Sequence, residues 1–260
     1  MDLVDTHCHL DVPAFDMDRE AVLKRCRDNG IRRLVIPGID SPGWNGLLDL
    51  CHNEPGLYPA LGLHPVYLDK HLPGDIELLE KQVARISPVA VGEIGLDYFI
   101  PELDRDRQLD LFEAQLGIAR DHELPVILHV RKAHDTVLAA LRRSGVAGGI
   151  AHAFNGSLQQ AMQYLDLGFK LGFGGTLTWE RSSRIRKLAS GLPLEAIVLE
   201  TDAPDMVVSA HRGERNSPEY LPDCLQALAE IRHQEPEIIA DQTTRNACEV
   251  LSLDRNAGIV

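Results

Sequence analysis

Eight short apolar runs, most of them rich in β-branched residues, alternate with amphipathic stretches along the chain. The runs cover residues 3–6, 33–37, 57–63, 89–92, 125–128, 149–151, 169–172 and 196–199. Most are continuously apolar rather than alternating in polarity, which is typical of strands buried on both faces of a parallel sheet. Few architectures accommodate eight such strands in one chain.

The stretches between the runs carry apolar residues at intervals of three and four, as on one face of a helix. Two examples are the sets Ile76, Leu79, Val83, Ile86 and Leu109, Phe112, Leu116, Ala119. Alternating strands and helices predict an α/β fold, a single (β/α)8 TIM barrel domain over residues 1–260. An open doubly wound sheet is the alternative, but no glycine-rich dinucleotide motif follows the first run. Two further helices are expected near residues 218–233 and 236–251.

Charge and composition limit the classes of function. Asp and Glu outnumber Lys and Arg by 39 to 26, for a net charge of −13. This balance argues against a protein that coats duplex DNA, but not against an enzyme that handles one strand end at a metal site. No apolar run is long enough to span a bilayer, and the first residues do not resemble a secretory leader. We therefore expect a cytoplasmic protein without membrane association, either a monomer or a weak oligomer.

Histidines and carboxylates mark the ends of the predicted strands. His7 and His9 are two apart on the first strand, so both face one side, and Cys8 faces the helices as a small core residue. TIM barrels build their active sites at the carboxyl ends of the strands. These residue types suit Zn, Mn, Fe or Mg, and one carboxylate can bridge two cations. The sequence therefore predicts a metal site formed by His7, His9, Glu93, His129, His152 and Asp202.

Eight ordered motifs carry a family resemblance. They are DTHCHLD at 5–11, LGLHP at 61–65, GEIGLDY at 92–98, LHVRKA at 128–133, HAFNG at 152–156, LETDAP at 199–204, RGERNSPEY at 212–220 and TTRNA at 243–247. With these motifs the chain resembles the TatD family of metal-dependent hydrolases, within the amidohydrolase-like barrel superfamily. Residues 205–208 depart from the family pattern, which commonly has an aromatic residue and a proline-containing turn there. This departure bears on the shape of substrate that the site accepts and leaves the set of metal ligands unchanged.

The resemblance implies a centre of two divalent ions (Mg, Mn or Zn). One ion would be held by His7, His9 and Asp202, the other by His129 and His152, with Glu93 bridging the two. Asp202 would also act as general base for the attacking water. His64 and Arg131 match positions where the family contacts substrate phosphate.

Other polar residues have simpler interpretations. Asp97 and Glu200 either orient the histidines or form structural ion pairs. Gly172, Gly174 and Gly175 are expected in a tight turn, with Arg212 and Asn216 as weaker phosphate contacts. Solvent-exposed positions are expected for His52, His71, His122, His134, His211 and His233.

The leading functional hypothesis is phosphoester hydrolysis. The resemblance implies a phosphodiesterase or deoxyribonuclease that acts on nucleotides or on single-stranded DNA or RNA ends. A C–N hydrolase (amidase, lactonase or deaminase) with the same ligands is the alternative, and a metal-binding scaffold without catalysis is a third. Glu93 favours the first, because many amide-cleaving relatives bridge their metals with a carboxylated lysine, and no lysine occupies this position.

Overall fold

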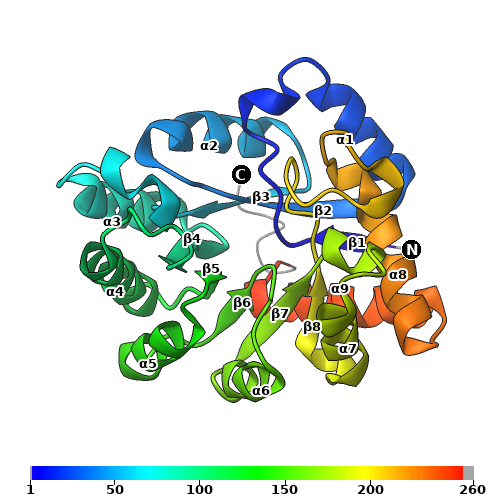
Figure 1. The fold of residues 1–260 in the computed structure, drawn as a ribbon. Helices are drawn as coiled ribbons and strands as arrows, with labels where there is room; N and C mark the ends of the chain where they lie inside the picture. The colour runs from blue at the N-terminus through cyan, green and yellow to red at the C-terminus, as the bar shows by residue number, and fades with distance from the viewer. Residues whose placement is uncertain (1, 254–260) are drawn as a thin grey trace.

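The structure is a computed structural model that describes residues 2–253. Eight parallel strands pair in chain order to form one sheet (Figure 1). They are β1 (Leu3–Asp5), β2 (Ile31–Pro37), β3 (Leu57–Leu61), β4 (Ala90–Asp97), β5 (Val126–Arg131), β6 (Gly149–Ala151), β7 (Phe169–Phe173) and β8 (Ile197–Leu199). Backbone hydrogen bonds from Thr6 N to the Leu199 carbonyl (3.1 Å) and from Asp202 N to the His7 carbonyl (2.8 Å) join the two edges. The predicted (β/α)8 barrel is therefore confirmed.

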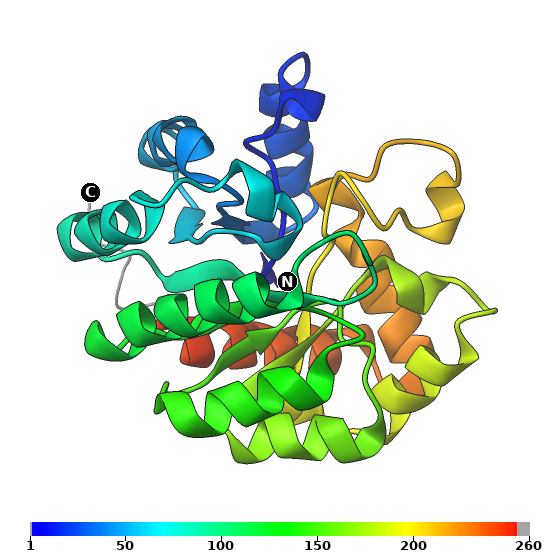
Figure 2. The same ribbon diagram turned by 60° about the vertical axis from the view of Figure 1, so that its left-hand side comes forward.

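Nine α-helices and seven short 3-10 helices complete the described part of the chain, and the α-helices that connect strands lie on the outside of the barrel (Figure 2). The α-helices are α1 (Arg19–Asp28), α2 (Trp44–Asn53), α3 (Asp75–Ile86), α4 (Arg105–Asp121), α5 (His134–Ser144), α6 (Leu158–Asp166), α7 (Ser183–Gly191), α8 (Leu221–Arg232) and α9 (Pro236–Leu251). The two helices expected late in the chain correspond to α8 and α9. The predicted domain also includes residues 1 and 254–260, which lie outside the described residues.

Two apolar layers build the core. The smaller layer fills the interior of the barrel with one side chain from most strands: Val4, Val35, Ala60, Ala90, Ile127, Ile150 and Val198. Ala247 and Leu251 of α9 pack against this layer together with Leu253, and Figure 1 shows α9 behind strands β6 to β8. The larger layer lies between strands and helices and contains Cys8, fully buried as predicted. With α9 covering the start of the strands, the carboxyl ends remain open for a site.

Several predicted strand limits were wrong, and three of them concern the ligands. Strand β1 ends at Asp5, so His7 and His9 follow it rather than lie within it. The backbone beyond Asp5 forms hydrogen bonds alternately with β8 and β2, and Cys8 N, for example, donates to the Val35 carbonyl at 3.1 Å. Strand β4 continues beyond Gly92 and contains Glu93, since it pairs with β5 as far as Asp97 after a register shift. Strand β5 likewise continues past Leu128 to Arg131 and contains His129. These errors shift the ends of strands but leave the affected side chains at the mouth.

None of the helices within residues 2–253 is both long and apolar enough to cross a lipid bilayer.

Candidate metal centre

The six predicted ligands meet at the carboxyl ends of the strands, and Glu93 lies at their centre. Its Oε2 is 3.1 Å from His7 Nε2 and 3.4 Å from His9 Nε2. Its Oε1 is 2.9 Å from His129 Nδ1 and 3.3 Å from His152 Nε2. Each oxygen thus faces a different pair of histidines, which is the arrangement that a carboxylate bridging two cations requires.

Asp202 completes one of the two sets. Its Oδ1 lies 3.6 Å from His7 Nε2 and 3.8 Å from His9 Nε2. The residue lies three positions after β8 and has a left-handed backbone (φ 56°), a conformation that aspartate tolerates better than most residues. The backbone hydrogen bond to His7 holds the two segments together at this point.

The outer nitrogens of two histidines face carboxylates. His129 Nε2 is 3.0 Å from Asp97 Oδ2, and His152 Nδ1 is 3.4 Å from Glu200 Oε1. A neutral ring with its proton on the outer nitrogen keeps a free lone pair on the inner one, and metal-binding histidines are typically oriented in this way. For Asp97 this geometry corresponds to orientation of the histidine, whereas His152 Nδ1 faces Glu200 without forming a hydrogen bond to it.

The outer ring nitrogens of His9 and His7 differ in their hydrogen bonding. His9 Nδ1 lies 3.2 Å from the Pro37 carbonyl, to which it donates in the neutral ring, leaving Nε2 free toward the centre. The two inner nitrogens of His7 and His9 are only 3.2 Å apart, and the outer Nδ1 of His7 is buried without a partner. Four imidazoles and two carboxylates with inward lone pairs are a donor set that fits divalent ions such as Zn or Mn.

Burial and charge perturb the centre strongly. Burial raises the pKa of Asp202 to about 6, although the charges of His152 and His9 oppose this shift. Burial also disfavours ionisation of Glu93, but the surrounding histidines outweigh it and hold its pKa well below the usual range. For His9, burial acts against protonation, yet the hydrogen bond and charge of Glu93 raise its pKa to about 9. Without ions the centre therefore retains protons, which a metal has to displace.

His64 lies among the ligands but differs from them in its hydrogen bonding. Its Nε2 is 3.2 Å from Glu93 Oε1 and 3.2 Å from His129 Nδ1, close enough to join a metal cluster. However, its Nδ1 accepts a hydrogen bond from Val66 N at 3.1 Å, which places the proton of the neutral ring on Nε2. Burial lowers the pKa of His64 to about 4 and so favours this neutral form. His64 therefore presents a donor to the site rather than a ligand lone pair.

Arg131 lies at the edge of the same cavity. Its Nη1 is 3.3 Å from Asp97 Oδ2, and the side chain is partly exposed. The cavity has a volume of about 700 Å³ and is also lined by His64, Tyr67 and Asp202. Both residues predicted to contact substrate thus line the cavity of the metal centre.

Two residues near the site were not identified from the sequence or were interpreted differently. Asp5, fully buried, accepts hydrogen bonds from Thr201 Oγ1 (2.6 Å), Thr201 N (3.0 Å) and His7 N (3.2 Å). Its place just before the HxH pair was the available signal. The predicted exposure of His134 was wrong: it is buried, with Nδ1 3.2 Å from the hydroxyl of Tyr164.

The glycines after β7 create space rather than only a turn. A Cβ on Gly172, which lies inside β7, would overlap with Oε2 of Glu200. A Cβ on Gly174 would approach the Glu200 carbonyl at 2.6 Å, and one on Gly175 would overlap with the Met206 carbonyl. Gly172 and Gly174 thus leave room for Glu200, and Gly175 leaves room for the backbone of Met206.

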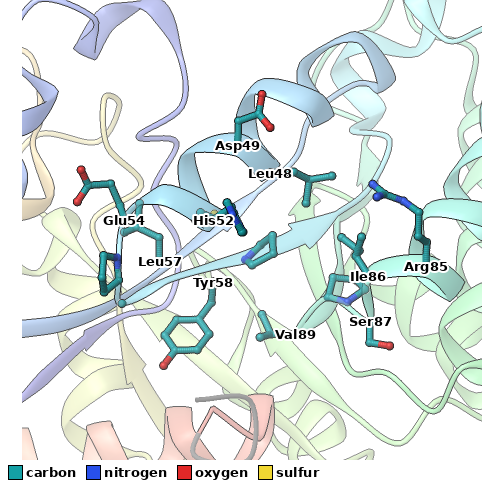
Figure 3. Close-up of a pocket in the computed structure, with 15 residues that line it drawn as sticks. Leu48, Asp49, His52, Glu54, Leu57, Tyr58, Arg85, Ile86, Ser87 and Val89 are labelled. Carbon is teal, nitrogen blue, oxygen red and sulfur yellow. The ribbon is translucent and has the colours of Figure 1, made fainter. Parts of the chain in front are cut away.

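A second cavity of about 700 Å³ lies between α2, β3 and the end of α3 (Figure 3). Its lining includes Leu57, Tyr58, Arg85 and Val89. Within residues 2–253, none of the clusters of three or more possible metal ligands lies there. The first cavity is therefore the candidate site.

Comparison with known proteins identifies the family. The sequence model described as TatD related DNase matches residues 4–252. The chain belongs to the TatD family. The metal-dependent hydrolase YjjV of Escherichia coli K12, whose function is described as uncharacterized, is 41% identical over 94% of this chain and 95% of its own length. The crystal structure of YjjV, described as a TatD homolog, superposes with a TM-score of 0.92 over 95% of this chain and 97% of that one.

A TatD relative with a more specific name is also similar. The 3'-5' ssDNA/RNA exonuclease TatD of Klebsiella pneumoniae is 30% identical over 98% of this chain and 99% of its own length. The predicted TatD family and TIM barrel are thus confirmed, and the protein is a metal-dependent hydrolase of that family.

Proposed function

We propose that this TatD protein is a divalent-metal-dependent phosphodiesterase that removes nucleotides from the ends of single-stranded DNA or RNA. The observation that carries the proposal is the position of the Glu93 carboxylate, because its two oxygens face two separate sets of ligands. The name of the Klebsiella pneumoniae relative supports nucleic acid as the substrate. The net charge of −13 favours a strand end over a long duplex.

Two divalent ions (Mg, Mn or Zn) fit the donor set. His7, His9 and Asp202 would hold one and His129 and His152 the other, with Glu93 between them. When bound, such ions polarise a phosphoryl oxygen, activate water and stabilise the leaving oxygen. The protein then has to supply a base and bind the phosphate.

Asp202 is the proposed general base. Its carboxylate lines the cavity beside His7 and His9, where it can accept a proton from an attacking water. Asparagine has nearly the same size but cannot accept the proton. We expect Asp202→Asn to lower the rate by about 10²–10⁴-fold while part of the bound metal remains.

His64 and Arg131 are the proposed phosphate contacts. The Nε2–H of His64, which follows β3, and the guanidinium of Arg131, at the end of β5, are donors that line the cavity on either side of β4. A planar guanidinium matches the oxygens of a phosphate group. Neither side chain has to hold a metal in this arrangement.

The test is an assay with added Mg, Mn or Zn on single-stranded DNA, RNA, phosphomonoesters and cyclic amides. We expect cleavage of oligonucleotides, its loss with EDTA, and its return with divalent ions. The rate and bound metal of Asp202→Asn are measured on the same preparation. Hydrolysis of cyclic amides without phosphodiester cleavage would instead indicate the C–N hydrolase, and bound metal without any turnover would indicate the scaffold.

A further inference from the structure

Phe99 is a large aromatic residue that remains exposed beside the metal centre. It follows β4 by two residues, and 52% of its surface is accessible to solvent. Its backbone N donates a hydrogen bond to Asp97 Oδ1 at 2.9 Å. The ring is therefore attached next to a buried group of the site rather than to a distant loop.

Two cations lie against this ring. The guanidinium carbon of Arg131 is 4.3 Å from the ring centre, and Lys132 Nζ is 4.8 Å from it. Both distances lie within the range of cation–π contacts. Among the described residues, no carboxylate pairs with Lys132, so its charge is available to a ligand. In a chain of net charge −13, this group is a local positive region around an aromatic ring that is half exposed.

Arg131 connects the group to the catalytic cavity. It lines the cavity, and its Nη1 shares Asp97 Oδ2 with the outer nitrogen of His129. Phe99 is thus one side chain beyond the edge of the cavity. A strand whose scissile phosphate lies at the metal centre would place an adjacent nucleotide near Phe99.

We infer that Phe99, Arg131 and Lys132 form a subsite for the nucleotide next to the scissile phosphate, an inference that rests on the proposed function. The base stacks on Phe99 and Lys132 binds the neighbouring phosphate, while Arg131 lies between these two side chains and the scissile phosphate. Stacking accepts any base, because every base has an aromatic face, and it requires a base that is not already paired. The subsite therefore selects single strands without selecting sequence.

The experiment compares two oligonucleotides that differ at one position. One carries a normal base at the nucleotide next to the scissile phosphate, and the other carries an abasic residue there. We expect the wild-type protein to cleave the first with a kcat/KM about tenfold higher or more, as base–aromatic stacking predicts. Phe99→Ala should bring the two values together, and Phe99→Trp should keep them apart.

Control variants separate stacking from structural damage. Met162→Ala removes an apolar side chain of similar exposure (45%) from α6 and should leave the preference for a base unchanged. Bound metal and the midpoint of thermal unfolding show that the Phe99 variants remain folded. Lys132→Gln should lower the slope of log affinity against log salt by about one unit, as expected for one lost phosphate contact.

Two results would overturn the subsite alone. One is an equal loss of cleavage of both oligonucleotides in Phe99→Ala. The other is loss of the preference in Trp179→Ala but not in Phe99→Ala, since Trp179 also lies near cations, Arg181 at 4.6 Å and Arg212 at 6.0 Å. A wild-type protein that cleaves no oligonucleotide at all would overturn the proposed function, and the subsite with it.

Discussion

Replacing Asp97 with asparagine tests how the protein prepares His129 for a metal. Asp97 Oδ1 accepts hydrogen bonds from the backbone N atoms of Phe99 (2.9 Å) and Ile100 (3.3 Å). These donors require an oxygen, so the amide nitrogen of asparagine takes the place of Oδ2. That nitrogen then faces His129 Nε2 and Arg131 Nη1, which are donors in the native arrangement.

The substitution reverses the preferred proton position on the imidazole. With a donor opposite Nε2, His129 is favoured to carry its proton on Nδ1, the atom 2.9 Å from Glu93 Oε1. A protonated Nδ1 has no lone pair for a metal. A hydrogen bond to a charged group contributes about 1.5–3 kcal/mol, which corresponds to roughly a tenfold to hundredfold loss of affinity. The same range is typical when a group that orients a metal-binding histidine is lost.

The loss should be confined to one of the two ions, because Asp97 contacts neither His7 nor His9. We expect Asp97→Asn to retain close to one ion per chain after dialysis under conditions in which the wild-type protein retains two, measured by elemental analysis. Asp110→Asn makes the same chemical change on the exposed face of α4 and should leave both ions in place. Two tightly held ions in Asp97→Asn, or equal weakening of both, would refute the assignment of His129 Nδ1 as a ligand.

Three further predictions concern the same centre. His64→Ala should raise KM for phosphodiesters about tenfold or more with unchanged bound metal, whereas loss of an ion would make it a ligand. In calorimetric titrations, metal affinity should rise between pH 6.5 and about 9. The reason is that the metal displaces the proton of His9, whose pKa is raised to about 9. An affinity independent of pH would contradict this. Gly172→Ala should lower the free energy of unfolding in urea by about 1–3 kcal/mol by displacing Glu200, while Gly117→Ala, with open space around it, should not.

The sequence was sufficient for the order of elements and the location of the ligands. Apolar runs identify strands buried on both sides, and the rule that barrel sites lie at the carboxyl ends places histidines and carboxylates from distant segments together. A shift of a strand end by a few residues does not move them away from the mouth. For this reason Glu93 was predicted in the right place although β4 continues through it.

The sequence was insufficient where the burial or protonation of a side chain depends on which groups surround it in the structure. Glu93 is polar enough to suggest the end of a strand, and only the surrounding histidines make its burial favourable. His134 at the start of α5 resembles a surface residue, but the hydroxyl of Tyr164 and the side chain of Asn155 satisfy both of its ring nitrogens in the interior. Likewise, the donor character of His64 depends on the backbone N of Val66, and no residue pattern contains that information.

Closure of the barrel has a consequence for the chain as a polymer. Thr6 and Leu199, which join β1 and β8, are 193 positions apart, whereas His129 and Glu93 are separated by 36. The entropy cost of closing a loop rises by about 0.6 kcal/mol per doubling of its length, so the longer closure costs roughly 1.5 kcal/mol more. An ion bound by both His7 and Asp202 would close the long loop between the first and eighth strands. An ion bound by His129 and Glu93 would close only the short loop between those two residues. The first ion would therefore cross-link the first and last strands of the barrel and stabilise the fold, in addition to any role in catalysis.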